Sequence, residues 1–350
     1  MTQRRSAAPT ITDVARHAAV SMKTVSRVLN GEPNVVPALR ERVMASVAAL
    51  NYRPNVNARS LAGARSYLLG LLYYASSAAF VVGLQRGATT RCRQRGYHLV
   101  VEPLEDGAAD LAQQISQMIS ALRPDGMILA PPVSDNAEVI RLLAAAGTPC
   151  VLISPGDHNP ARGSVSMDDT LAAREMTDYL LALGHRRIGF ICGPAAQAAA
   201  PRRLAGYAQA LAARGLALDP ALVVQGDFTF RTGQEACDAL LDLASPPTAI
   251  FAANDDMALG AAVAAQRRGL QVPSGLSIAG FDDSPLASLA WPQLSTVRQP
   301  VVEMAETAVD LLVARPGTAV DAASTTTSVL GHTLVIRQST AAPAGHAGPG

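Results

Sequence analysis

This 350-residue chain contains one lysine, four cysteines and few aromatic residues, and each shortage narrows what it can be. Only 4% of the residues are aromatic, so the hydrophobic cores must be built mainly from Ala, Leu and Val. The cysteines form no C-x-x-C pair and no metal-ligand spacing, which favours reduced core residues in the cytoplasm over disulfides or a metal site. No apolar run approaches the roughly 20 residues of a membrane span. Arg4 and Arg5 precede no apolar segment of the signal-peptide kind.

Glycine-rich phosphate-binding loops are missing as well. Neither a G-x-G-x-x-G motif nor a P-loop occurs, so we expect no nucleotide cofactor and no other cofactor. The length predicts more than one domain. The formal net charge of +1 is unevenly distributed. Residues 1–65 carry ten basic and three acidic side chains, a charge of +7, which leaves −6 for the remainder. A basic head on a mildly acidic body indicates a polyanionic partner for the head alone.

Residues 10–50 show the pattern of three short helices. Thr10 can cap the first helix with Asp13 at its third position, Ser21 can cap the second, and Pro37 suits the first turn of the third. A short second helix with a polar, basic outer face can enter the major groove of DNA. The predicted outward residues near its start are Met22, Lys23, Ser26 and Arg27. The predicted buried residues are Ile11, Val14, Ala15, Ala18, Val25, Val28, Leu29, Leu39, Val43, Val47 and Leu50.

Residues 55–62 could add two helical turns, but eight residues are too few for a stable isolated helix. We expect this segment to order only on DNA and against a second copy. Leu61 would then be an apolar residue facing DNA, where it can wedge into a minor-groove base step. The alternative is that Leu61 packs on the body.

The head and the segment after it resemble the DNA-binding head and hinge of the LacI/GalR family of bacterial repressors. The matching stretches are DVA at 13–15, VS at 20–21, TVSRVLN at 24–30, Y-x-PN at 52–55 and ARSLA at 58–62. The resemblance implies that Met22 and Lys23 choose the operator bases and that Leu61 intercalates at the operator centre. The residues that it assigns to DNA binding are Thr10, Ser21, Met22, Lys23, Thr24, Ser26, Arg27, Asn30, Tyr52, Asn55, Ala58, Arg59 and Leu61.

Two positions depart from the family pattern. Ala19 stands in the turn where the family usually has glycine, and a left-handed backbone there would cost on the order of 1 kcal/mol. Val36 stands where a capping serine is usual, which would remove one phosphate contact.

From residue 66 onward, apolar runs alternate with helical patterns, which predicts parallel sheets with helices on both faces. The natural break between two such sheets lies near 164–168. The predicted strands are 67–74, 98–102, 126–130, 150–154, 188–192, 222–224, 249–253, 277–281 and 330–336. The clearest predicted helices are 80–96, 170–183, 203–215 and 257–269.

The family resemblance extends over this body to about residue 339, most strongly at ALGHRRI (182–188), RLAGY (203–207), ANDDMALG (253–260) and GFDD (280–283). It implies an α/β protein: a small all-α helix-turn-helix head and a type I periplasmic-binding-protein-like body of two subdomains with doubly wound parallel sheets. The chain would cross between the subdomains near Val165, Val297 and Ser324. The expected divisions are a disordered arm (1–9), the head (10–54), a hinge helix and linker (55–65), an N-subdomain (about 66–165 and 298–324), a C-subdomain (about 166–297 and 325–338) and a disordered tail (339–350).

A ligand would bind in the cleft where strand carboxyl ends and helix amino ends converge. Arg, Asn and Asp side chains can pair with sugar hydroxyls, and phenylalanine rings can stack on a sugar face. The predicted effector-binding residues are Tyr74, Phe80, Ser154, Arg203, Phe228, Asn254 and Asp282. Purely structural roles remain as alternatives to ligand binding: Arg203 in an interface ion pair, Asp255 or Asp282 as a helix cap or dipole partner, and Phe80 in a subdomain core.

These observations favour a cytoplasmic, nucleoid-associated transcriptional repressor of carbohydrate genes. It would bind a pseudo-palindromic operator as a homodimer and be released by a small sugar. Its partners would be operator DNA, the effector and a second copy, with no membrane. The tail lacks leucine heptads, which favours a dimer over a tetramer. A purine-type corepressor is the alternative effector. An enzyme using Asp255/Asp256 and Asp282/Asp283 is disfavoured, because adjacent carboxylates cannot easily flank a glycosidic bond.

Overall fold

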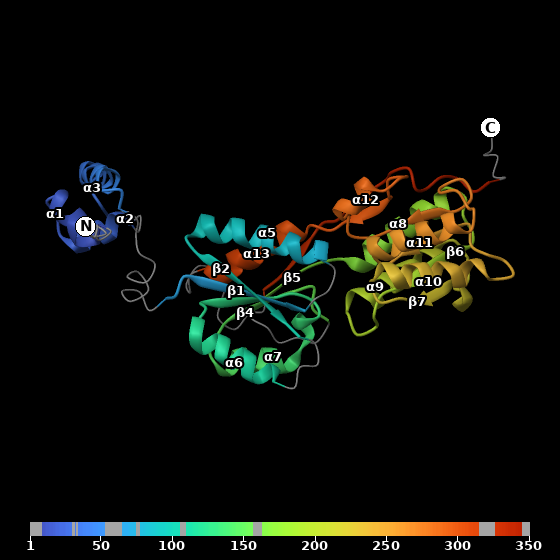
Figure 1. The fold of residues 1–350 in the computed structure, drawn as a ribbon, viewed down its shortest axis with the longest axis horizontal. Helices are drawn as coiled ribbons and strands as arrows, with labels where there is room; N and C mark the ends of the chain where they lie inside the picture. The colour runs from blue at the N-terminus through green and yellow to red at the C-terminus, as the bar shows by residue number, and fades with distance from the viewer. Residues whose placement is uncertain are drawn as a thin grey trace, which may run out of the picture. The chain divides into compact units, whose positions relative to one another are not determined.

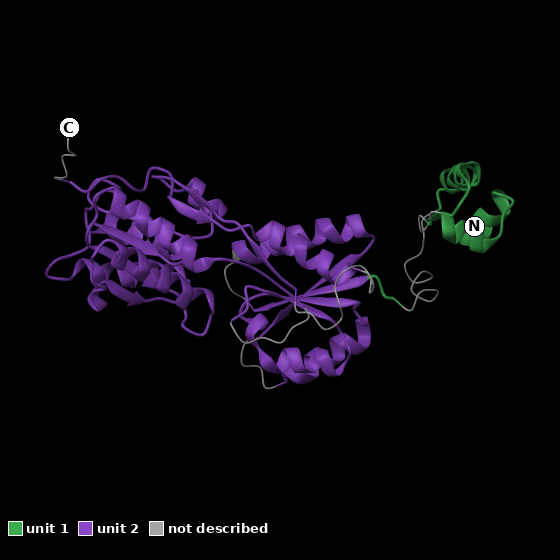
Figure 2. Cartoon of the chain, turned by 180° about the vertical axis from the view of Figure 1, so that it is seen from behind, with its two compact units in different colours: residues 1–67 green, residues 68–350 purple. Residues whose placement is uncertain are grey.

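The computed structural model describes residues 9–29, 32, 34–52, 65–74, 78–105, 110–156, 163–314 and 326–344. Contacts within the chain separate it into two compact units, residues 1–67 and residues 68–350 (Figure 2). The described residues of the first unit form helices α1, α2 and α3, and those of the second form alternating strands and helices (Figure 1). Among the described residues, no helix is both long and apolar enough to cross a membrane.

The head consists of α1 (Ile11–His17), α2 (Met22–Leu29) and α3 (Pro37–Ala49). Its helices begin where the sequence predicts. The Thr10 hydroxyl accepts from the Asp13 backbone and the Asp13 carboxylate accepts from the Thr10 backbone, which completes the capping box. The Ser21 hydroxyl accepts from the Thr24 backbone N–H at 3.1 Å at the start of α2. The helices share a small core that includes Val14, Val25 and Val43.

Ala19 has a φ of +50°, so the turn between α1 and α2 is left-handed at a residue with a side chain. We predict that Ala19→Gly stabilises the head by about 1 kcal/mol, because it removes the steric cost of that conformation. Hydrogen exchange of head amides in the full chain measures this effect. Ala18→Gly is the matched control: Ala18 is buried with a φ of −82°, so glycine there should destabilise the head. Equal destabilisation by both changes would contradict the prediction.

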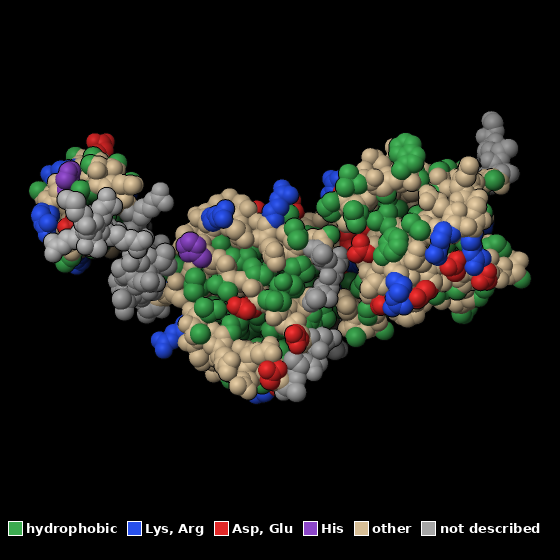
Figure 3. All heavy atoms as spheres, in the orientation of Figure 1, with side chains coloured by type: hydrophobic (Ala, Val, Ile, Leu, Met, Phe, Trp, Pro, Cys, Tyr) green, Lys and Arg blue, Asp and Glu red, His purple; other side chains and the backbone are tan. Residues whose placement is uncertain are grey.

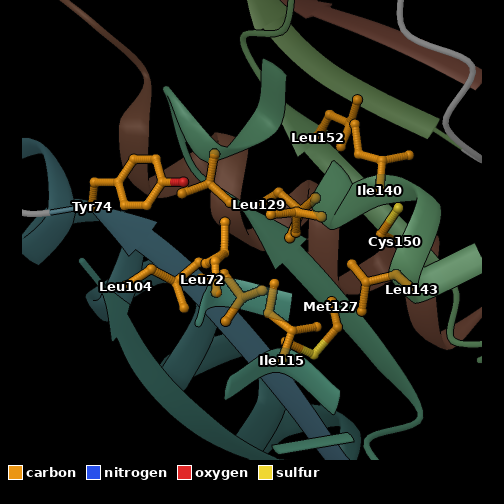
Figure 4. Close-up of a cluster of buried hydrophobic side chains, with 13 residues drawn as sticks. Leu72, Tyr74, Leu104, Ile115, Met127, Leu129, Ile140, Leu143, Cys150 and Leu152 are labelled. Carbon is orange, nitrogen blue, oxygen red and sulfur yellow. The ribbon is translucent and has the colours of Figure 1, made fainter. Parts of the chain in front are cut away.

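The first half of the body is a six-stranded parallel sheet with the order β11-β5-β4-β3-β1-β2. Helices α5 and α13 cover one face, and α6 and α7 cover the other (Figure 1). Figure 4 shows the core on the second side, where β1, β3 and β4 contribute buried apolar side chains against α6 and α7. The strands are β1 (Leu68–Tyr74), β2 (His98–Leu104), β3 (Gly126–Leu129), β4 (Cys150–Ile153), β5 (Gly163–Met167) and β11 (Thr326–Leu330). The helices are α5 (Ala78–Arg95), α6 (Leu111–Leu122), α7 (Ala137–Ala145) and α13 (Val301–Val313).

The second half is a four-stranded parallel sheet with the order β7-β6-β8-β9. Its helices pack in two close pairs, α8 with α9 and α10 with α11. The strands are β6 (Ile188–Cys192), β7 (Val223–Gln225), β8 (Ala249–Ala252) and β9 (Ser277–Ala279). The helices are α8 (Asp169–Ala182), α9 (Ala199–Ala213), α10 (Phe230–Leu241), α11 (Asp255–Arg267) and α12 (Pro285–Leu289).

Two segments that run between the halves pair with each other. Strand β10 (Thr296–Arg298) and strand β12 (Thr333–Val335) form an antiparallel two-stranded sheet. Strand β11 differs from the sequence prediction, which assigned residues from 325 onward to the second subdomain. It pairs with β5 in the first sheet, so the chain leaves that sheet only after Leu330. Neither β5 nor β11 was predicted as a separate strand, because both are short and rich in Ser, Thr or Gly.

The start of the predicted disordered tail is ordered, which corrects the boundary at 339. Ser339 and Thr340 are buried, and the Ile278 backbone N–H donates to the Ser339 carbonyl at 2.8 Å. The His185 ring and the Ser277 hydroxyl both contact the Ala341 carbonyl, at 2.9 and 3.0 Å. Backbone pairing beside β9 therefore holds this segment, although its sequence carries no strand pattern.

Candidate functional site

Helix α2 presents a polar face away from the head core. Met22 is 54% exposed and Lys23 is also exposed, whereas Val25 and Val28 are buried. Ser26 and Arg27 are half-buried, and the Arg27 guanidinium donates to Glu32 at 2.8 Å. The start of α2 therefore exposes Met22 and Lys23, two of the side chains that the sequence predicts to approach DNA.

The other predicted DNA-binding residues fall into two groups. Thr10 and Ser21 use their hydroxyls as helix caps at the surface, and the half-buried Thr24 hydroxyl lies 2.9 Å from that of Ser21. Tyr52 is instead buried in the head core, where burial raises its pKa. Val36 precedes α3 and makes no side-chain cap, as its apolar side chain requires. The residues that lie outside the described part of the chain are Asn30, Asn55, Ala58, Arg59 and Leu61.

Lys23 offers a direct test of the face of α2. Lys23→Ala should cost about 1–3 kcal/mol on the preferred operator and relax the base preference at one position, as expected for a side chain that reads a base edge. Competition binding to a library of operator variants measures both effects. Arg40→Ala on α3, whose guanidinium donates to the Glu32 carbonyl, is a suitable charge-matched control. Uniform weakening on all sequences would instead assign Lys23 to a phosphate.

A cavity that opens to solvent lies where the carboxyl ends of the body strands meet the amino ends of α8, α9 and α11. Phe80, Pro131 and Ser154 line it from the first half, and the other lining residues come from the second half. Six of the seven predicted effector-binding residues meet in this cavity: Phe80, Ser154, Arg203, Phe228, Asn254 and Asp282. The lining residues that were not predicted are Pro131, Asp169, Gln197, Ala199 and Gln299.

Tyr74 does not line the cavity, which departs from the prediction. It belongs to the core of the first half, and its hydroxyl accepts from the Asn136 side chain at 3.0 Å. Alternation along β1 places Tyr74 on the same face as the buried Leu72, and that face covers α6 and α7.

Arg203 is the cation of the cavity, and its side chain is only 6% exposed. Its Nε donates to Asp169 Oδ1 at 2.9 Å, and its Nη1 donates to the Ala253 carbonyl at 2.6 Å. The guanidinium also stacks on Phe281, 3.6 Å from the ring centroid. Asp169 opens α8 and Arg203 is the fifth residue of α9, so the close α8–α9 pair sets the geometry of this ion pair.

Asp282 follows β9 with a φ of +124°, a conformation that directs its carboxylate toward Arg203 and Gln299. The Gln299 amide donates to Asp282 Oδ1 at 2.6 Å, and Arg203 Nη1 lies 3.9 Å from the same oxygen. Burial raises the pKa of Asp282 to about 6, and the charge of Arg203 and the Gln299 hydrogen bond limit that rise. Buried Asp255, behind the cavity, also has a raised pKa, mainly through desolvation.

Asn254 supports Phe228 rather than pointing freely into the cavity. Its Oδ1 caps α11 by accepting from the Met257 backbone, and its Nδ2 donates to the Phe228 carbonyl at 2.9 Å. Phe228 has a φ of +69°, and a Cβ at Gly193 would overlap its ring. Asn254 and Gly193 together therefore fix one aromatic wall of the cavity.

Beside the cavity, one hydrogen bond crosses between the halves and a pair of ion pairs holds the crossing strands to the second half. Arg202, on α9, donates to the Pro155 carbonyl of the first half at 2.9 Å. Asp283 accepts from Arg298 of β10 and from Arg337, just after β12, both at 2.6 Å. Neighbouring residues Asp282 and Asp283 thus connect the cavity to the paired crossing strands.

A helix-turn-helix head and a ligand-sized cleft between two α/β halves define a class of ligand-responsive DNA-binding regulators. Residues 10–55 match the family model of bacterial regulatory proteins of the lacI family, and residues 177–340 match that of the periplasmic binding protein-like domain. Catabolite control protein A of Priestia megaterium is 35% identical over 87% of this chain and 91% of its own length. The chain therefore belongs to the lacI family. Like its relatives, it is a transcriptional regulator and not an enzyme.

Two solved structures of regulators match this chain over nearly its whole length. The complex of the transcriptional regulator CelR with cellobiose matches with a TM-score of 0.72 and 31% identity over 95% of this chain and 99% of that one. The lac repressor dimer bound to operator and the anti-inducer ONPF matches with a TM-score of 0.76 and 30% identity over 96% and 100%. The predicted family and fold class are therefore confirmed.

Proposed function

We propose that this regulator represses carbohydrate-utilisation genes in the cytoplasm by binding a pseudo-palindromic operator as a homodimer. A small sugar in the cleft would release it from the operator. The observation that carries the proposal is the cavity itself, which Arg203, Asp169 and Asp282 line together with Phe80 and Phe228. Paired donors and acceptors opposite apolar rings suit a molecule with hydroxyls at its edge and an apolar face.

The similarity to a regulator solved with cellobiose supports a sugar. Binding would act on the operator through the relative arrangement of the two halves. A ligand that contacts both Phe80 and Arg203 favours one arrangement over the other, and only such differential binding can shift an equilibrium. The Arg202–Pro155 hydrogen bond crosses between the halves, so that rearrangement would break or form it. The Asp283 ion pairs hold the crossing strands β10 and β12 beside it.

A homodimer is supported by an exposed apolar patch on the second half. Leu286 is 53% exposed, Leu289 is 78% exposed and Trp291 is 86% exposed. Hydrophobic side chains gather at the surface around α12, which carries the first two (Figure 3). Contiguous exposed apolar side chains commonly mark protein–protein contacts, and a two-fold dimer would match a two-fold operator. Light scattering that shows a tetramer at micromolar concentration would contradict this assignment.

Selection of bound DNA from a random pool tests the operator part of the proposal. The expected product is a pseudo-palindrome of two half-sites, because two-fold protein symmetry imposes two-fold DNA symmetry. The Lys23→Ala variant, selected in parallel, should give the same spacing with one relaxed position in each half-site. Selected DNA with a single half-site and no symmetry would exclude binding as a two-fold dimer.

A further inference from the structure

The lining of the cavity carries more carboxylates than cations. Its eleven lining residues include two carboxylates, Asp169 and Asp282, and a single cation, Arg203. Each carboxylate has one oxygen engaged within the protein: Asp169 Oδ1 by Arg203, and Asp282 Oδ1 by Gln299. Among the described residues, no hydrogen bond reaches Oδ2 of either group. The second oxygen of each carboxylate therefore has no donor among these residues, and the Asp282 side chain is 12% exposed against 2% for Asp169.

Arg203 has little freedom to serve an anion. Two of its nitrogens already donate within the protein, its plane stacks on Phe281, and its side chain is 6% exposed. Turning toward a phosphate would leave Asp169 as an uncompensated buried charge, which is strongly unfavourable. The next cation along α9, Arg202, donates to the Pro155 carbonyl instead of lining the cavity.

The helix amino ends near the cavity offer anions little compensation. Asp169 occupies the first turn of α8, and Asp255 and Asp256 occupy the first turn of α11. Carboxylates at these positions already interact with the positive ends of the helix dipoles. Helix α9 lacks an acidic first turn, but its two arginines, Arg202 and Arg203, both donate hydrogen bonds within the protein. Around neutral pH Asp282 is charged, since even its raised pKa of about 6 lies below 7.

We infer that this cleft selects uncharged, hydroxyl-rich ligands and excludes their phosphorylated forms, with Asp169 and Asp282 as the residues that set this specificity. The inference rests on the proposed effector role of the cleft and narrows its ligand class. A phosphate dianion bound beside Asp169 and Asp282 would face two carboxylates, and like charges repel one another. A neutral polyol can instead donate its hydroxyls to the open Oδ2 atoms.

Titration calorimetry on the full chain at pH 7.5, with matched pairs of probes, tests the inference. The pairs are glucose and glucose 6-phosphate, ribose and ribose 5-phosphate, and adenosine and its 5′-monophosphate. In each pair with a binding member, the phosphorylated form should bind about 100-fold more weakly or worse. A phosphorylated form that binds as tightly as its partner overturns the inference. If only adenosine binds, the sugar proposal fails while the exclusion of phosphate stands.

The variant Asp282→Asn separates charge from shape, because asparagine keeps the size of the side chain and tolerates a positive φ. In this variant, the difference in affinity between the free and the phosphorylated member of a binding pair should fall to about 10-fold. Asp242→Asn, an exposed change at the end of α10, should leave this difference in affinity unchanged. Inorganic phosphate serves as a probe that needs no known effector. It should raise the melting temperature of Asp282→Asn more than that of the unmodified chain, and equal shifts in both proteins overturn the inference.

Discussion

Replacing Arg203 with alanine should abolish the response of operator binding to the effector and lower the free energy of unfolding of the body by about 3–5 kcal/mol. The loss of response follows because Arg203 is the cation of the cavity. The loss of stability follows because Asp169, only 2% exposed, would be left buried without its ion-pair partner. Calorimetry of the effector and denaturant unfolding of the same preparations measure the two effects separately.

Two further variants separate the loss of effector binding from the loss of stability. Arg203→Lys retains a positive charge near Asp169 but not the planar fork, so it should recover most of the stability and little of the effector affinity. Arg214→Ala removes a half-exposed arginine at the end of the same helix and should change neither. An Arg203→Ala protein that still responds fully to the effector would show that Arg203 is only a structural ion-pair partner.

Gly206→Ala should destabilise the body by about 3 kcal/mol and weaken effector binding at the same time. A Cβ at Gly206 would overlap the Thr170 carbonyl of α8 and lie 2.8 Å from the Arg174 nitrogen. These are backbone atoms, so α8 and α9 must move apart. Gly206 lies one turn after Arg203, and Thr170 directly follows Asp169, so the separation falls on the ion pair that anchors the cavity.

Thermal unfolding and effector titration of the Gly206→Ala chain measure this coupled loss. Gly331→Ala is the matched control, since a Cβ there would meet no atom within 4 Å. Its melting temperature and effector affinity should equal those of the unmodified chain. If Gly206→Ala kept full effector affinity despite a lower melting temperature, the packing of α8 on α9 would not position Arg203.

Local chemistry made most of the elements predictable. Thr10, Ser21 and Pro37 mark helix starts because capping and proline preferences act within one turn of the chain. Apolar runs identified β1 and β6 because both are buried. Strands β5 and β11 pair with each other across more than 150 residues, and that pairing leaves no local pattern.

The candidate site was predictable in part for the same reason. Arg203, Asn254 and Asp282 stand at helix starts or strand ends, which parallel topology brings to one edge. Asp169 reaches the site by pairing with a residue 34 positions away, and Gln299 by following a crossing strand. Tyr74 also stands at a strand end, but side-chain alternation turns it into the core, and sequence position alone cannot fix that direction.

The central claim is that a ligand in the cleft changes the affinity of the head for DNA. Its most direct test is the affinity of the full chain for its selected operator at one fixed salt concentration, with and without mono- and disaccharides and purines. We predict that one uncharged sugar weakens operator binding by about tenfold or more and that Arg203→Ala removes this effect. A purine that tightens operator binding, with no sugar acting, would contradict the account and make the cleft a corepressor site.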